Sequence, residues 1–274
     1  MRRRQRYFPA LFAFLMIPTV AVAAKLQPAA LKAWETYIRL TEQRIERELS
    51  STAGFSHQDF MPADEAARVR DALNNGRIYV SRMNTRDKDG GKIGIPNGMV
   101  HHWFGSVYIP KTNVESVILW VQNYNRHYRY FKEVEQSKLI SREGDTFKIF
   151  LRFVRTKAIT VRYNTEHTVV YRRHGPGRES SRSWTTRIAE IRDAGTASAS
   201  EWMPGDDSGY LWRLNSYWRF LQKDNGVIVE CESVSLSRSI PFGLAWLIEA
   251  YVESVPRESL ESTLAGIRDG LKLP

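Results

Sequence analysis

Apolar and polar residues alternate along the chain between residues 146 and 172. Phe147, Ile149, Leu151 and Phe153 occupy every second position of the first part, and more polar residues lie between them. The second part, from residue 158, repeats this pattern. A period of two is typical of β-strands with one buried face. Short connections such as 143–145 favour hairpins, so we predict five or six antiparallel strands between residues 134 and 238.

Other segments repeat apolar residues at every third or fourth position, which predicts helices. These segments are residues 26–50, 63–73, 112–131 and 242–271. Thr112 and Glu115 form a predicted capping box at the start of the third helix. Pro256 is expected to break or kink the last one. Residues 77–83 and 99–110 read as strands, and residues 84–98 form a glycine-rich loop that matches no phosphate-binding motif.

The order of these elements predicts the fold class. Two helices and two strands come first, followed by a long helix, the run of strands and a long terminal helix. A sheet with one apolar face must be covered, and the terminal helix is the expected cover. We therefore predict an α+β fold in which a curved antiparallel β-sheet grips a long C-terminal helix. Residues 25–76 form an N-terminal helical extension, and residues 77–274 form the domain itself.

The stretch from residue 209 to 238 is rich in aromatic residues and arginines. Its strand pattern puts Trp212, Trp218 and Phe220 on one face and the arginines on the other. A hairpin loop with an even number of residues places Arg219 opposite Glu230 or Glu232, where opposite charges stabilise a strand pair. These arginines then have carboxylate partners, which argues against a nucleic-acid groove.

The first 24 residues carry a basic start, an apolar run and a small-residue cleavage pattern ending at Ala23. This pattern predicts a signal peptide and a periplasmic or secreted protein. Without its four arginines, the formal net charge falls from +10 to +6. A charge of +6 is compatible with an anionic membrane surface as a partner, and equally with an ordinary basic surface. Cys231 is the single cysteine, so no internal disulfide forms.

Candidate catalytic residues are few. His101 and His102 are adjacent, so they point to opposite faces of a strand and cannot chelate one metal together. We predict no metal site and no cofactor. Three charged residues, Arg162, Glu166 and Arg187, are possible polar anchors for a ligand. The alternative is that they lie on a solvated outer face of the sheet, which we favour.

The pattern resembles a known superfamily. The segments WFGSVYIPKTNVESVILWVQNYNRHYRYF, GYLWRLNSYWRF, GVIVECESVSLSRSIPFGLAWLI and VPRESLESTLAGIRDGLK carry this resemblance. Together they are similar to START-like (SRPBCC) helix-grip domains of the polyketide cyclase/dehydrase and lipid-transport type, and to exported bacterial members without an assigned activity. The resemblance covers about residues 99–274. It implies a cavity for an apolar ligand between the sheet and the terminal helix.

The apolar face of the sheet then supplies the expected ligand contacts. These are Tyr163, His167, Tyr171, Trp212, Trp218, Phe220 and, from the terminal helix, Trp246. Our first hypothesis is a non-catalytic carrier or sensor of a hydrophobic ligand, such as a lipid. The alternatives are a cyclase or hydratase using acid–base residues in the same cavity, and an interaction module whose cavity its own side chains fill. His167 and Glu230 are the ionisable residues on which catalysis would depend.

Overall fold

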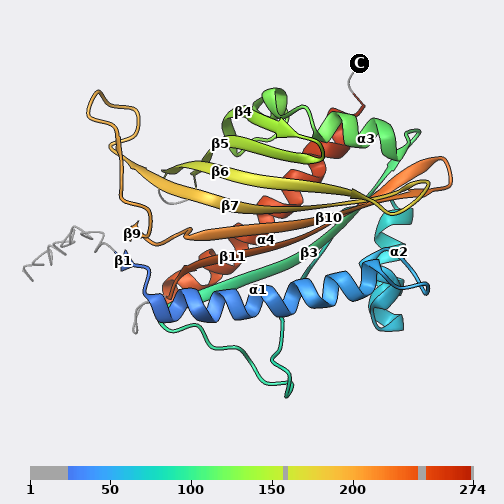
Figure 1. Ribbon diagram of the computed structural model, residues 1–274, viewed down its shortest axis with the longest axis horizontal. Coiled ribbons are helices and arrows are strands. Elements are labelled where there is room, and N and C mark those ends of the chain that lie inside the picture. Colours follow the sequence, from blue (N-terminus) through green and yellow to red (C-terminus); the bar gives the residue numbers. More distant parts are fainter. Residues whose placement is uncertain (1–23, 157–159, 240–244, 273–274) are drawn as a thin grey trace, which may run out of the picture.

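The fold is that of a computed structural model, which describes residues 24–156, 160–239 and 245–272. The predicted signal peptide therefore lies outside the described residues, apart from Ala24. One antiparallel sheet dominates the molecule (Figure 1). In spatial order its strands are β2 (Tyr79–Arg82), β3 (Gly98–Pro110), β11 (Gly226–Arg238), β10 (Arg213–Lys223), β7 (Arg178–Arg192), β6 (Thr160–Arg173), β5 (Thr146–Thr156) and β4 (Val134–Glu143). The predicted run of antiparallel strands is confirmed.

Two short strand pairs lie at one end of this sheet. Strand β8 (Ser200–Glu201) pairs with the end of β7, and β9 (Asp206–Asp207) pairs with β1 (Ala24–Lys25). Strands β8 and β9 belong to the long connection between β7 and β10. This connection therefore has hydrogen-bonded structure of its own.

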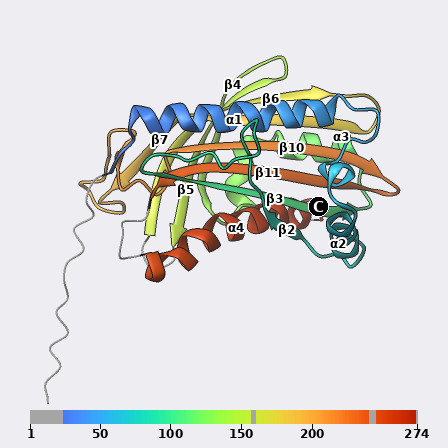
Figure 2. The ribbon, with the colours of Figure 1, turned by 90° about the horizontal axis from the view of Figure 1, so that it is seen from below.

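Helix α4 (Ala245–Gly270) crosses one face of the sheet, which we call the inner face (Figure 2). Leu260, Leu264 and Ile267 of α4 are buried against strand residues such as Val229 and Phe220. At Gly105 of β3 the helix comes so close that a Cβ atom would lie 2.6 Å from the Leu264 side chain. The sheet and its terminal helix form the helix-grip arrangement predicted from the sequence. Pro256 does not end α4, because the packed turns after it keep the segment helical.

Helix α1 (Pro28–Leu49) covers part of the opposite face, which we call the outer face (Figure 2). Its apolar stripe meets outward residues of β10 and β11. The buried cluster consists of Trp34, Tyr37, Ile38, Ile45, Trp212, Tyr217, Val234 and Leu236. A short 3₁₀ helix, η1 (His57–Phe60), and α2 (Ala63–Asn74) follow, and α2 packs Val69 and Leu73 on Phe104. The N-terminal extension is thus a second layer on the sheet.

The predicted long helix at 112–131 is wrong in its length and in its cap. The structure has α3 (Val114–Val121) followed by a 3₁₀ helix, η2 (Tyr124–Arg129). The cap is Asn113, whose side chain accepts a hydrogen bond from the Ser116 amide, and not Thr112. The helix stops because Tyr124 turns into the core, where its hydroxyl bonds that of Tyr171 at 2.6 Å. Apolar spacing alone does not distinguish these two helix types.

The hairpin of β10 and β11 has the expected even-length loop. Asp224 and Asn225 form the turn, and Arg219 lies opposite Glu230. Trp218 is opposite Cys231, and Phe220 is opposite Val229. The large aromatic side chains therefore share the inner face with smaller partners, as predicted.

Candidate functional site

A row of three serines crosses the middle of the inner face. Ser183 of β7, Ser216 of β10 and Ser233 of β11 are direct neighbours on adjacent strands. They point to the same side as Trp218 and Cys231, which belong to the α4 core. Ser216 and Ser233 are only partly buried, although both lie on central strands of the sheet. Small side chains in the centre of a covered face leave space that large apolar residues would fill.

Large aromatic residues border this serine row. Trp218 is two positions from Ser216 on β10, and Trp103 of β3 is opposite Ser233. Both tryptophans pack against the core but are only partly buried, as is Phe153 of β5. The Trp218 indole donates a hydrogen bond to the Ser216 hydroxyl at 3.2 Å. These residues combine apolar side chains with a few hydroxyl groups, which are the kinds of groups that usually line a small-molecule pocket.

The inner face is tightly packed at its other end. Phe220 is 1% exposed, and Val227 and Val229 are fully buried under the second half of α4. Tyr171 is also buried, and its hydroxyl is used by Tyr124. Phe220 and Tyr171, which we expected to contact a ligand, therefore lie in the packed core in this structure.

His167 and Tyr163 extend the site along β6. Both are buried, and His167 bonds the Thr165 hydroxyl at 2.9 Å. Burial lowers the pKa of His167 to about 4, so the ring is neutral at physiological pH. Burial raises the pKa of Tyr163 well above its ordinary value, and the nearby Glu190 adds to the effect. These groups offer neutral hydrogen-bonding partners inside an apolar surface.

Trp212 and Trp246 were also expected to contact the ligand. Trp212 lies in the α1 cluster on the outer side, where its indole donates to the Asp207 carboxylate at 3.2 Å. Its expected place beside Trp218 is wrong because β10 begins only at Arg213, so the alternation of faces does not extend back to residue 212. Trp246 is helical in α4, but its side chain lies outside the described residues.

The expected polar anchors lie on the outer face, away from the serine row. Arg162 donates to Glu135 at 2.8 Å. Arg187 pairs with Glu201, which also accepts from Asn164 at 2.7 Å. Glu166 is opposite Arg187 on the same face. This is the solvated-face alternative that we favoured, so these residues cannot bind a ligand held on the inner face.

A buried cluster of charged residues joins α1 and η1 to the outer face. The hairpin pattern predicted Glu230 or Glu232 as the partner of Arg219, whereas the structure assembles a larger set. Its members are Tyr37, Arg44, Glu48, His57, His102, Arg219, Glu230 and Glu232. Arg219 bonds Glu48 and also donates to the Phe55 carbonyl at 3.0 Å. The spacing of Arg44 and Glu48 along one helix face is the local signal in α1 for this cluster.

The carboxylates of this cluster are in different electrostatic environments. Burial alone would raise the pKa of Glu48, but the hydrogen bond of His57 and the charges of Arg219 and Arg44 outweigh it and hold the pKa at about 2. Burial of Glu232 is likewise outweighed by Arg44 and His102, so its pKa lies far below the ordinary value. Burial prevails at Glu230, whose pKa is raised although two amides, including that of His57, bond it. The cluster therefore fastens α1 to the sheet.

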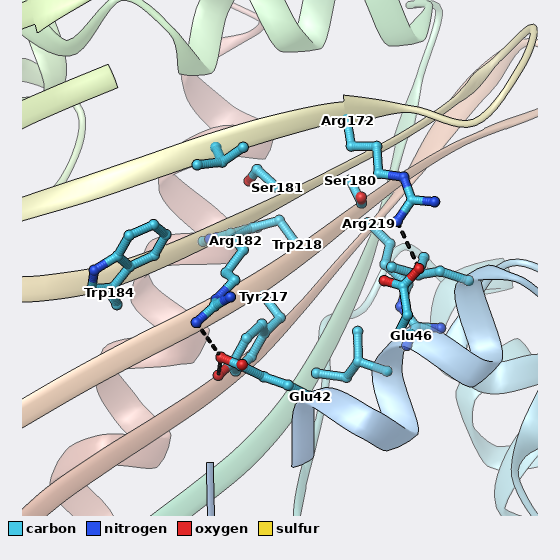
Figure 3. A pocket seen from close by; sticks show the side chains of 13 residues that line it. Glu42, Glu46, Arg172, Ser180, Ser181, Arg182, Trp184, Tyr217, Trp218 and Arg219 are labelled. Carbon is cyan, nitrogen blue, oxygen red and sulfur yellow. Dashed lines mark hydrogen bonds and ion pairs between the residues drawn. The ribbon is translucent and has the colours of Figure 1, made fainter. Parts of the chain in front are cut away.

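A hollow of about 320 Å³ lies beside this cluster, between α1 and strands β6, β7 and β10 (Figure 3). Ile45, Leu49, Val170 and Trp184 provide apolar lining. Two ion pairs reach from α1 to the sheet at its rim, Glu46 with Arg172 at 2.7 Å and Glu42 with Arg182 at 2.9 Å. Because these charges already have partners, the hollow offers no strong site for a charged group.

The remaining candidates for metal or thiol chemistry are separated. His102 bonds Tyr37 and Glu232 on the outer side, whereas His101 contacts Ser237 at 2.9 Å. Within residues 24–156, 160–239 and 245–272, no group of three or more His, Cys, Asp or Glu side chains is placed to hold a metal. Cys231 is buried on the inner face, and burial raises the pKa of its thiol.

No family model matches the chain, and no curated protein matches it. Among solved structures it is similar to a STAR-related lipid transfer protein from Xanthomonas axonopodis, at 16% identity and a TM-score of 0.46, over 71% of this chain and 99% of that one. It is also similar to the Zhui aromatase/cyclase from Streptomyces sp. R1128, at 9% identity and a TM-score of 0.43, over 64% of this chain and 94% of that one. The lipid transfer and protein localization domain of human StarD13 shows 10% identity and a TM-score of 0.43, over 77% of this chain and 98% of that one. Likenesses at these identities and TM-scores do not indicate an activity for this chain.

Proposed function

We propose that the protein binds a hydrophobic ligand of the lipid class, without chemical change, between the serine row and the first part of α4. The observation that carries the proposal is the partial exposure of Ser216, Ser233 and Trp218 in the centre of a helix-covered face. A domain of this size normally fills such a position with large apolar side chains. An apolar ligand bordered by Trp103 and Trp218 would supply the missing contacts.

The polar groups of the site fit a ligand with a small number of oxygen or nitrogen atoms. The serine hydroxyls can donate or accept, and neutral His167 adds one further polar group. No charged side chain among those described lies in the row of Trp103, Ser233, Ser216 and Ser183. The site therefore favours an uncharged or weakly polar portion of the ligand over an ionic head group.

Native mass spectrometry of the purified protein tests this proposal. We expect an additional mass of lipid size that organic extraction removes. Ser216→Leu combined with Ser233→Leu should fill the row and abolish the added mass while the protein stays folded. Thr186→Leu, at an exposed position of β7, adds similar apolar bulk elsewhere on the same sheet and should leave the ligand bound. A wild-type protein free of ligand that also binds no added lipid would refute the proposal.

A catalytic role has less support. His167 lies on the inner face, whereas Glu230 is bonded to η1 on the outer face. The two ionisable candidates are thus separated by the sheet and cannot act on one substrate. His167 alone, with its pKa at about 4, is a weak base at neutral pH.

A further inference from the structure

The connection between β7 and β10 exposes an unusual group of apolar side chains. Six large apolar side chains are exposed in the part of the chain that the structure describes, and three of them lie between residues 202 and 210. Trp202 is 37% exposed, Met203 75% and Tyr210 39%. We call these three residues the apolar edge. Single exposed apolar residues are common on proteins, but a group of this kind usually marks a contact surface.

The backbone that carries the apolar edge is held firmly. The Trp202 amide donates to the Glu190 carbonyl at 2.8 Å, next to the β7–β8 pairing. Ser208 donates to both carboxylate oxygens of Glu190, through its amide at 3.0 Å and its hydroxyl at 2.7 Å. Asp207 is 1% exposed and accepts from the Gly209 amide at 2.7 Å. Two buried carboxylates therefore fix a surface segment whose outward side chains are apolar.

Arginines accompany both aromatic rings of the edge. The Arg192 guanidinium lies over Trp202, 5.5 Å from the ring centroid, and Arg238 lies over Tyr210 at 5.4 Å. Tryptophan and tyrosine beside arginine are typical of residues at the boundary between lipid chains and head groups, where an apolar body and a polar end are both satisfied. Asp193 and Asp206 are exposed nearby, which limits the net positive charge of this surface.

The apolar edge also lies where the N-terminal part of the chain reaches the domain. Strand β9, within the same connection, pairs with Ala24 and Lys25 (Figure 1). Tyr210 also lies close enough to Tyr163 of the inner face to affect its pKa. This end of the molecule thus combines the exposed aromatic residues with one end of the inner face.

We propose that the apolar edge docks the protein on a lipid bilayer, with Trp202, Met203 and Tyr210 at the depth of the head groups. The chemistry of the edge fits a bilayer, because Arg192 and Arg238 can meet phosphate head groups while the rings beside them and Met203 reach the boundary of the lipid chains. Since the exposed aspartates offset part of the arginine charge, we expect only a modest preference for anionic lipid. This docking does not depend on the ligand proposed for the inner face.

Site-specific fluorescence tests this proposal in the full chain. Cys231 is 2% exposed, so an environment-sensitive dye will label a new surface cysteine selectively. We would label Met203→Cys and, as the matched control, Leu119→Cys in α3, which is 71% exposed and distant in sequence. The vesicles are phosphatidylcholine, with and without a minority of phosphatidylglycerol.

We expect a several-fold rise in dye emission at position 203 on addition of vesicles, and little change at position 119. Trp202→Ser in the Met203→Cys background should weaken vesicle binding about tenfold or more, as the loss of one buried aromatic side chain implies. No response at position 203 would overturn the proposal, and so would equal responses at both positions, because the second result means attachment without a defined edge.

Discussion

Replacing Glu48 tests whether the buried charged cluster holds α1 on the sheet. Its carboxylate contacts Arg44, His57 and Arg219, and its side chain is 8% exposed. A carboxyl whose pKa falls from 4.5 to about 2 on folding stabilises the native state at neutral pH by about 3 kcal/mol. We therefore expect Glu48→Gln to lower the free energy of unfolding by about 3 kcal/mol at pH 7, measured by urea denaturation.

The pH dependence supplies the second half of this test. Because the pKa of Glu48 is lower in the folded state, its contribution is complete above pH 4.5 and disappears as the pH falls towards 2. The difference between wild type and Glu48→Gln should therefore shrink over that window. The pKa of Glu230 is raised in the folded state, so its own contribution to stability changes with pH in the opposite direction. The measured quantity is therefore the difference in unfolding free energy between wild type and Glu48→Gln at each pH.

The matched control is Glu46→Gln, two positions away on the same helix. Glu46 pairs with Arg172, but both side chains are 56% exposed. Exposed ion pairs contribute under about 1 kcal/mol. Equal effects of Glu48→Gln and Glu46→Gln would refute the reasoning, because they would mean that the Glu48 carboxylate is hydrated in the folded protein.

Three further predictions follow from burial and capping. Phe220→Ala should destabilise the protein by about 3–5 kcal/mol in denaturant unfolding, and Trp218→Ala should cost clearly less because its site is already partly open; equal costs would contradict the proposed space. Asn113→Ala should lower the free energy of unfolding by about 1 kcal/mol through loss of the α3 cap, whereas Thr112→Ala should leave it nearly unchanged. The reverse order would mean that Thr112 is the cap after all. Cys231 should resist a thiol reagent in the native protein and react on unfolding, and rapid native labelling would show that the inner face opens at β11.

The alternation of residues predicts much of the sheet, because each strand side chain is assigned to a face by counting. It places Trp218, Phe220 and Cys231 correctly on the inner face, and it limits the cross-strand partner of Arg219 to Glu230 or Glu232, of which the structure has Glu230. Counting fails at Trp212, where the strand has not yet begun. Helical spacing also misleads at residues 122–131, where the 3₁₀ helix η2 replaces the second half of the predicted α-helix.

The serine row and the buried charged cluster could not be predicted from the sequence, because their members meet only through the packing of separate elements. Ser183, Ser216 and Ser233 come from three separate strands, and nothing in their local sequence indicates that they become neighbours. The charged cluster joins Glu48 to Arg219, 171 residues away in the chain. Local patterns give the face of a residue, but only the register between strands and the packing of α1 determine which residues meet.

Photo-crosslinking with a diazirine-bearing fatty acid, followed by peptide mapping, tests the central claim most directly. The proposed ligand site predicts labelled peptides from β7, β10 and β11 around Ser183, Ser216 and Ser233, with labelling lost in the Ser216→Leu, Ser233→Leu protein. Labelling of α1 near Ile45 and Leu49, unchanged in that variant, would place the ligand in the outer hollow and contradict the account.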